Sequence, residues 1–414
     1  MNKYKLGDIS EIQSGPFGTQ LHKDEYVLEG IPMLNSKNIG NGIVVEDSLD
    51  FVPEAVCERL PRYVLKKGDI LFGRAGTIER HTYVDSKYDG CFQGTNCIRI
   101  RCKDKQKSRY ISYYLWLNKL KVKIENAAGG SIQSYITTDL LKDIEVEIPD
   151  DYEKRANFLS LIDEKIHHNN QINDNLEQQL MLLYDYWFTQ FDFPDNDGNP
   201  YQTSGGKVVW NDTLKRNIPE NWKVQSVNSN CLSSIIKPGV EIFNTKTYLA
   251  TADVKGTSIS TGTIVDYDRR ESRANMQPSI NSVWFAKMKN SVKHLYLNKE
   301  MQPIISSSIL STGFCGLQCN EISFEYIASY VSNAYFEIHK DMLAHGATQE
   351  AVNNDDLAGV HIIIPEDTVL RAYHEATQAI YAQISKNICE NQELVKLRDW
   401  LLPMLMNGQA TISD

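Results

Sequence analysis

Two stretches of this chain, 216 residues apart, carry a related pattern. The first, GGSIQSYITTDLLKDIEVEIP, ends at Pro149, and the second, HGATQEAVNNDDLAGVHIIIP, ends at Pro365. Aligned without a gap, they share a Gly, a Gln, an Asp and a Leu, and both end in Ile-Pro. Solenoid repeats have periods of roughly 20 to 50 residues, so this longer period indicates that a whole domain has been duplicated.

Each copy is expected to form a mixed α+β domain. Short β-like runs broken by Gly, Pro, Asn and Asp begin each unit, as in GIPMLNSKNIGNGIVV and KTYLATADVKGTSIS. A helix-like aromatic segment follows, and an alternating strand, DIEVEIP or GVHIIIP, closes each unit. We therefore predict the fold class α+β, arranged as a tandem repeat of two similar domains.

A long helix with coiled-coil spacing follows each closing proline. In both helices, positions spaced alternately four and three residues apart carry the order Ile-Ile-Asn-Asn-Leu, which is the spacing of a coiled-coil seam. These seam positions are Ile162, Ile166, Asn169, Asn173 and Leu176, and Ile380, Ile384, Asn387, Asn391 and Leu394. Asn at a seam lowers stability but fixes register and partner, so we predict that the helices pair antiparallel about a pseudo-twofold axis. Packing of each helix on its own domain alone is the alternative.

These patterns set the expected domain boundaries. The segment between the first helix and the second domain is rich in Pro, Gly and Asn and lacks helical periodicity. We predict a first domain at 1–150, a first helix at 151–190, an extended connector at 191–217, a second domain at 218–366, and a second helix with its tail at 367–414.

Composition narrows the class of protein. With 42% hydrophobic and 10% aromatic residues, the chain can build packed cores and is not disordered. It has no run of 18 apolar residues and no apolar segment near residue 1, so we expect a cytoplasmic protein without a membrane span. The eight cysteines include no C-x-x-C pair, which favours free thiols over a zinc site.

The net charge of −10 does not exclude nucleic acid, because the charge is unevenly distributed. Residues 99–123 contain nine Lys or Arg and a single acid, Asp104. This stripe, which includes Lys121 and Lys123, can match a phosphate backbone. A solvated face beside a strand and a helix would give the same pattern.

Motifs for catalysis are incomplete. GNPYQ lacks the second proline of the N-P-P-Y loop of adenine methyltransferases, and SGGKVV has Val208 where a P-loop has Ser or Thr. Asp163 and Lys165 fit a nuclease pattern only loosely, and they flank seam positions of a helix, where solvation is their natural role. We expect no catalytic, cofactor-binding or metal-binding residue in this chain.

The chain resembles the specificity subunits of type I restriction-modification systems along its whole length. The resemblance is carried by DFP…NPY…SGGKVV…IPENW, by the seam helices and by LRDWLLPMLMNGQ. In addition, KLGDISEIQSGPFGTQL…GIPMLNSKNI…GDILFGRAG resembles a common type of first target-recognition domain. The resemblance implies a non-catalytic subunit that chooses a bipartite double-stranded DNA sequence for phage defence. It also implies two methyltransferase subunits around the helices and restriction (motor) subunits beside them, with S-adenosylmethionine, ATP and Mg used by those partners.

Candidate DNA contacts follow from the chemistry of base reading. Arg and Lys suit guanine, Asn and Gln suit adenine, and basic side chains and main-chain N–H groups suit phosphates. In the first domain the candidates are Ser14, Gly15, Arg74, Thr77, Arg80, His81, Lys121, Lys123 and Gln133, and in the second Lys287, Lys289, Asn290 and Gln349. An ordinary surface role is the alternative for each, and the repeated Gln133 and Gln349 could instead cap the segments that follow them.

Two other classes of function stay open from the sequence. A fused nuclease or modification enzyme would need a cofactor loop or metal-binding carboxylates, and the sequence shows neither. A scaffold would use the duplicated domains to bind protein rather than DNA.

Overall fold

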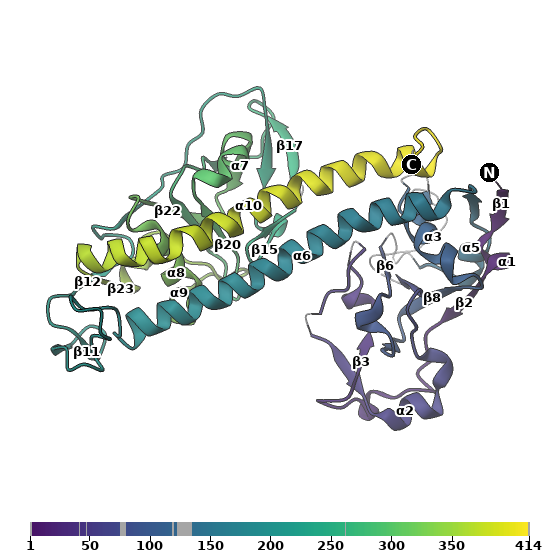
Figure 1. The fold of residues 1–414 in the computed structure, drawn as a ribbon, viewed down its shortest axis with the longest axis horizontal. Coiled ribbons are helices and arrows are strands. Elements are labelled where there is room, and N and C mark those ends of the chain that lie inside the picture. The colour runs from purple at the N-terminus through teal and green to yellow at the C-terminus, as the bar shows by residue number, and fades with distance from the viewer. Residues whose placement is uncertain are drawn as a thin grey trace. The chain divides into compact units, whose positions relative to one another are not determined.

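The computed structural model describes residues 2–40, 42–46, 48–74, 80–117, 120–121, 135–260 and 262–412. The chain divides into two compact units, each containing one copy of the repeat and part of both long helices (Figure 1). Unit 1 comprises Met1–Asp163 and Leu397–Asp414, and unit 2 comprises Glu164–Lys396.

Unit 1 contains three small sheets and short helices. The first sheet is antiparallel and has the order β2 (Ser10–Ser14), β8 (Cys97–Cys102), β5 (Ile70–Gly73), β6 (His81–Tyr83). The second has the order β4 (Asp50–Val52), β3 (Ile31–Leu34), β7 (Phe92–Gln93), with β3 and β7 parallel. The third pairs β1 (Asn2–Lys5) with β9 (Glu145–Ile148). The helices include α1 (Leu6–Ile9), α2 (Glu54–Arg59), α3 (Ser108–Leu115) and α5 (Thr138–Lys142).

Unit 2 repeats this plan and adds further strand pairs. Its first sheet has the order β13 (Ser233–Ile235), β22 (Phe314–Cys319), β19 (Ser282–Ala286), β20 (His294–Leu297), again antiparallel. Its second has the order β17 (Thr263–Asp266), β14 (Thr245–Leu249), β21 (Ser308–Ser311), β18 (Ala274–Met276), with β14 and β21 parallel. Other pairs are β12 (Lys223–Ser226) with β23 (His361–Ile364), β10 (Val208–Asn211) with β11 (Arg216–Pro219), and β15 (Val254–Lys255) with β16 (Ser258–Ile259). Its helices include α7 (Gln302–Ser307), α8 (Phe324–Ser332) and α9 (Ala334–Leu343).

The matching strand orders confirm the predicted α+β class and the tandem repeat. In both units one sheet is fully antiparallel, one mixes a parallel with an antiparallel pair, and one joins the first strand to the strand of the repeated stretch. The residues predicted as an extended connector contain the hairpin of β10 and β11. Among the described residues, no helix is both long and apolar enough to cross a bilayer.

The two long helices pair antiparallel, as predicted. They are α6 (Tyr152–Tyr184), which continues as a π-helical turn at Asp185–Thr189, and α10 (Asp367–Met406). Within unit 2, Asn169 Nδ2 donates to Asn391 Oδ1 at 2.9 Å, and Asn387 Nδ2 donates to Asn173 Oδ1 at 2.8 Å. Rising numbers on α6 thus meet falling numbers on α10, as the two side-by-side ribbons of unit 2 show (Figure 1).

Seam side chains are withdrawn from solvent on both helices. Ile162, Asn169, Asn173, Ile384 and Asn387 are buried, whereas Ile166, Leu176, Ile380, Asn391 and Leu394 are half-buried. The paired Asn side chains form hydrogen bonds with each other, so their amide groups have partners although they are withdrawn from water.

Candidate nucleic-acid interface

One hairpin of the antiparallel sheet has the same anatomy in both units. In β5–β6 the last cross-strand pair is Phe72 with His81, and in β19–β20 it is Phe285 with His294. Eight residues separate Phe from His in each hairpin, so the loops 73–80 and 286–293 correspond residue by residue.

This correspondence gives each basic position a counterpart. Arg74 matches Lys287, and Arg80 matches Lys293, so both loops carry a cation near each end. Lys293 was missed as a candidate, although the Phe-x8-His spacing in the sequence would have identified it. Thr77, which matches Asn290, lies outside the described residues.

The repeated stretch lies beside this hairpin in both units. The Val352 N–H donates to the Lys287 carbonyl at 3.0 Å, and the equivalent Ile136 N–H donates to the Arg74 carbonyl at 3.1 Å. Gly346 begins the stretch in unit 2 with a φ of +141°, and a Cβ there would lie 2.4 Å from the Gln349 carbonyl oxygen. Only glycine suits such a turn, which explains why this residue type recurs in the repeat.

In unit 2 the structure brings the four predicted contacts together. Lys287, Lys289 and Asn290 lie on the hairpin, and Gln349 lies exposed on the segment paired with it. The Lys289 N–H donates to the Glu350 carbonyl at 2.9 Å, and Lys289 Nζ lies 2.6 Å from Glu350 Oε2. This surface therefore combines a basic loop with exposed carboxamides, the groups suited to phosphates and bases.

The predicted contacts of unit 1 are more scattered. Arg74 is half-buried, Arg80 is exposed, and Ser14 lies half-buried at the end of β2. Gly15 is buried, its N–H donates to the Cys97 carbonyl at 2.8 Å, and a Cβ there would lie 2.0 Å from the Gly94 carbonyl oxygen. Gly15 thus serves close backbone packing, and its N–H is not available to a phosphate. Lys123 and Gln133 lie outside the described residues.

His81 is a core residue, which contradicts its prediction as a DNA contact. Its side chain is fully buried, with Nε2 2.9 Å from the Ser112 carbonyl oxygen. The ring stacks between Phe72 and Trp116, at centroid distances of 4.7 and 4.1 Å. Burial lowers the pKa of His81 to about 3, so the ring is neutral at physiological pH.

The basic stripe is only partly a surface feature. Arg99 is 1% exposed and donates to Glu11 Oε1 and Gln13 Oε1, while Arg101 forms an ion pair with Asp69 at 2.6 Å. Lys121, near the other end of the stripe, is half-buried with Nζ 4.6 Å from the Trp116 ring centroid. The two arginines therefore stabilise the sheet rather than face a phosphate backbone.

A buried charge network behind the unit 2 hairpin was not predicted. Glu337 on α9 lies 2.8 Å from His294 Nε2 through one carboxylate oxygen and 2.6 Å from Lys340 Nζ through the other. Burial alone raises the pKa of Glu337, but the hydrogen bonds from His294 and Lys340 outweigh it and hold the pKa below its usual value. Glu337 and Lys340 are three residues apart on α9, but His294 comes from β20, so no local pattern reveals the complete network.

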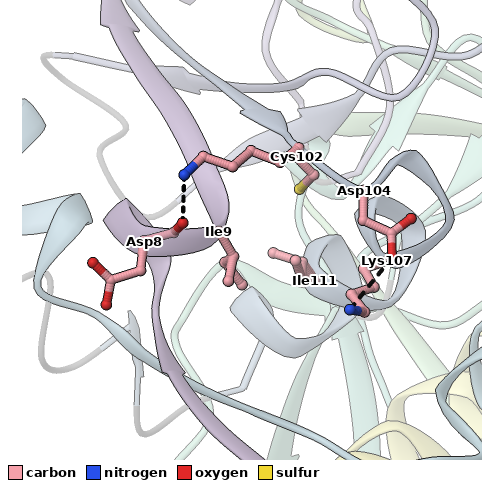
Figure 2. Close-up of a pocket in the computed structure, with 7 residues that line it drawn as sticks. Asp8, Ile9, Cys102, Asp104, Lys107 and Ile111 are labelled. Carbon is pink, nitrogen blue, oxygen red and sulfur yellow. Dashed lines mark hydrogen bonds and ion pairs between the residues drawn. The ribbon is translucent and has the colours of Figure 1, made fainter.

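Unit 1 has a pocket of about 200 Å³ between α1, β8 and α3. Figure 2 shows the side chains that line it. Lys103 Nζ donates to the Asp8 carbonyl at 2.7 Å, and Lys107 Nζ lies 3.3 Å from Asp104. These contacts hold the charged groups, and the remaining lining includes Ile9 and Ile111. Among the described residues, His, Cys, Asp and Glu side chains do not gather in groups of three or more that could hold a metal ion.

Sequence and structure comparisons point to one family. A family described as Type I restriction modification DNA specificity domain matches residues 1–178. The chain is similar to the MjaIX specificity subunit of Methanocaldococcus jannaschii, with 23% identity over 99% of this chain and 93% of the relative. It is 22% identical to the HindI specificity subunit of Haemophilus influenzae over 98% of this chain and 99% of that protein. Both relatives are type I restriction enzyme subunits.

A solved structure shares the fold. The S subunit of a type I restriction-modification system from M. genitalium aligns with a TM-score of 0.50, at 14% identity, over 100% of this chain and 96% of the other.

Proposed function

We propose that this chain, which belongs to the specificity subunits of type I restriction-modification systems, reads a bipartite DNA target with one recognition domain per half-site. The main support for this proposal is that the hairpins β5–β6 and β19–β20 are equivalent. Their loops have equal lengths but different residues. Hairpins of the same architecture with different loop side chains suit two DNA half-sites that differ in sequence. The antiparallel pairing of α6 and α10 supports a role for these helices in setting the spacing between the half-sites.

In this proposal the catalytic steps are carried out by partner subunits and not by this chain. The incomplete motifs in the sequence support a non-catalytic chain, so methylation with S-adenosylmethionine and ATP- and Mg-dependent cleavage belong to methyltransferase and restriction subunits. The helix pair offers a surface for them. In unit 1, Phe158, Leu161, Leu397 and Trp400 are large apolar side chains exposed on α6 and α10. Exposed apolar side chains gathered on helices in this way favour protein contact.

Exchange of the first domain tests this proposal. Residues 1–150 are replaced by the first domain of a relative with another target, and the complex is assembled with its methyltransferase subunits. Sequencing of methylated DNA is expected to show a change in one half of the motif, while the other half and the spacer stay the same.

The reciprocal exchange of residues 218–366 is the matched control and should change only the other half. A motif that stays unchanged in both chimeras contradicts the proposal and favours a protein-binding scaffold. Methylation by the purified chain alone would instead favour an enzyme.

A further inference from the structure

The loop of the β19–β20 hairpin presents an alternating set of side chains. Its sequence is KMKNSVK over residues 287–293. Met288, Asn290 and Val292 are exposed, and Val292 is 58% exposed although it is apolar. Lysines occupy three of the positions between and beside them. The loop therefore offers one carboxamide between two apolar side chains, flanked by cations.

The main chain at Asn290 is held in an unusual conformation. Asn290 has a φ of +56°, a left-handed region that Asn tolerates better than most residues. Its N–H donates to Asp341 Oδ2 on α9 at 3.1 Å. None of the described residues forms a hydrogen bond with its side-chain carboxamide. A polar group with an unused donor and acceptor thus stands at a fixed place on the surface.

The base of the same loop is fixed from α9. Lys340 Nζ donates to the Ala286 carbonyl at 3.2 Å at the start of the loop, and Glu337 contacts His294 at its end. Lys340 is fully buried and pairs with Glu337 at 2.6 Å, so this support cannot move without exposing or separating charges. A reader fixed before binding loses less entropy when it meets its target.

Resting on the proposed function, we infer that Asn290 reads an adenine edge in the half-site of the second domain, with Val292 against a neighbouring thymine methyl. An Asn carboxamide can pair in a bidentate way with adenine N6 and N7, and apolar groups contact the thymine methyl. The major groove admits a two-stranded β-ribbon, and Lys287 flanks the reader as a phosphate contact, whereas Lys293 Nζ donates to the Thr251 carbonyl. Thr77 occupies the corresponding sequence position in the first domain, so the two sequences differ at this position.

The test uses Asn290→Gly in the full chain assembled with its methyltransferase subunits. Glycine keeps the left-handed backbone and removes only the carboxamide. Binding to duplexes randomised in the second half-site is measured beside the wild type. Discrimination is expected to fall about 5- to 150-fold at one A·T position, with every other position unchanged.

Asn281→Gly is the matched control, because Asn281 also has a positive φ, of +57°, at the other end of β19. It should leave the motif unchanged. The inference is overturned if the wild-type second half-site contains no A·T pair, if Asn290→Gly keeps full discrimination, or if it weakens binding to all sequences equally. In each of these cases the wild type still selects a bipartite target, whereas a failure of the proposed function removes that selection.

Discussion

Two carboxylates of unit 2, the buried Glu337 and the half-buried Glu177, have opposite electrostatic surroundings. Glu337 lies between His294 and Lys340, which hold its pKa below the usual value of 4.5 in spite of burial. The pKa of Glu177 on α6 is raised, chiefly because the carboxylate is partly withdrawn from water. The Thr257 hydroxyl donates to this carboxylate at 2.6 Å and offsets the rise only in part. The first carboxylate therefore stabilises the fold when ionised, and the second destabilises it.

Substitution of each carboxylate should change stability in opposite directions. Glu337→Gln removes the nearer counter-charge of the buried Lys340, leaving only Asp341 at 3.5 Å, and is expected to cost roughly 3 to 5 kcal/mol at pH 7. Glu177→Gln is expected to raise the free energy of unfolding at pH 7. Urea unfolding between pH 4 and pH 8 measures both variants, with the exposed Glu393→Gln as a control near zero.

The pH dependence gives the sign of each effect. The contribution of Glu337, whose folded pKa is lowered, is present above pH 4.5 and is lost as the pH falls below it. For Glu177, whose folded pKa is raised, the penalty of ionisation appears as the pH rises above 4.5. Stability profiles with the same slope in wild type and Glu177→Gln would contradict this assignment.

At the scale of elements, the helix seam depends on paired carboxamides. Asn173 accepts from Asn387 at 2.8 Å, and both side chains are buried. Each amide satisfies the other, so loss of one leaves a buried polar group without a partner. Removal of both leaves Asn169 and Asn391, whose carboxamides are bonded at 2.9 Å, as the remaining polar pair of the seam.

A double-mutant cycle tests this dependence. Asn173→Leu and Asn387→Leu are each expected to cost about 1 to 3 kcal/mol in unfolding free energy, whereas the double variant should recover most of that loss. The double variant should keep its oligomeric state in light scattering, because Asn169 and Asn391 still mark the register. Additive losses would show that the two side chains do not act as a pair.

The seam was predictable from sequence because its spacing is local, and each step of three or four residues places a side chain on one face of a helix. The hairpin was only partly predictable. Lys287, Lys289 and Asn290 are surface residues of a loop, as their composition suggested, but the burial of His81 depends on Phe72 and Trp116, which come from other elements. The α9 support of the unit 2 loop likewise requires the tertiary fold.

At the scale of the whole molecule, residues from both ends of the numbering build unit 1. Leu405 and Met406 of α10 are buried in the core that contains Leu6 and Ile148. Arg155 on α6 donates to the Leu405 carbonyl, and Arg398 donates to Asp163 at 3.0 Å. The first recognition domain therefore completes its core with residues numbered more than two hundred positions later.

Truncation after Lys396 should affect the two units unequally. Loss of two buried side chains is expected to destabilise unit 1 by about 2 to 5 kcal/mol for each of them, and unit 2 should unfold as before. Calorimetry resolves the two transitions, and hydrogen exchange assigns each to its unit. Truncation after Asn407, which keeps both side chains, is the control. An unchanged unit 1 transition would contradict the shared core.

This shared core also orders events on the ribosome. Residues 164–396 can assemble as soon as they emerge, but the domain translated first must wait, with part of its apolar interior uncovered, until residues 397–406 have been made. An mRNA truncated within the second half would therefore yield a first domain whose core lacks Leu405 and Met406.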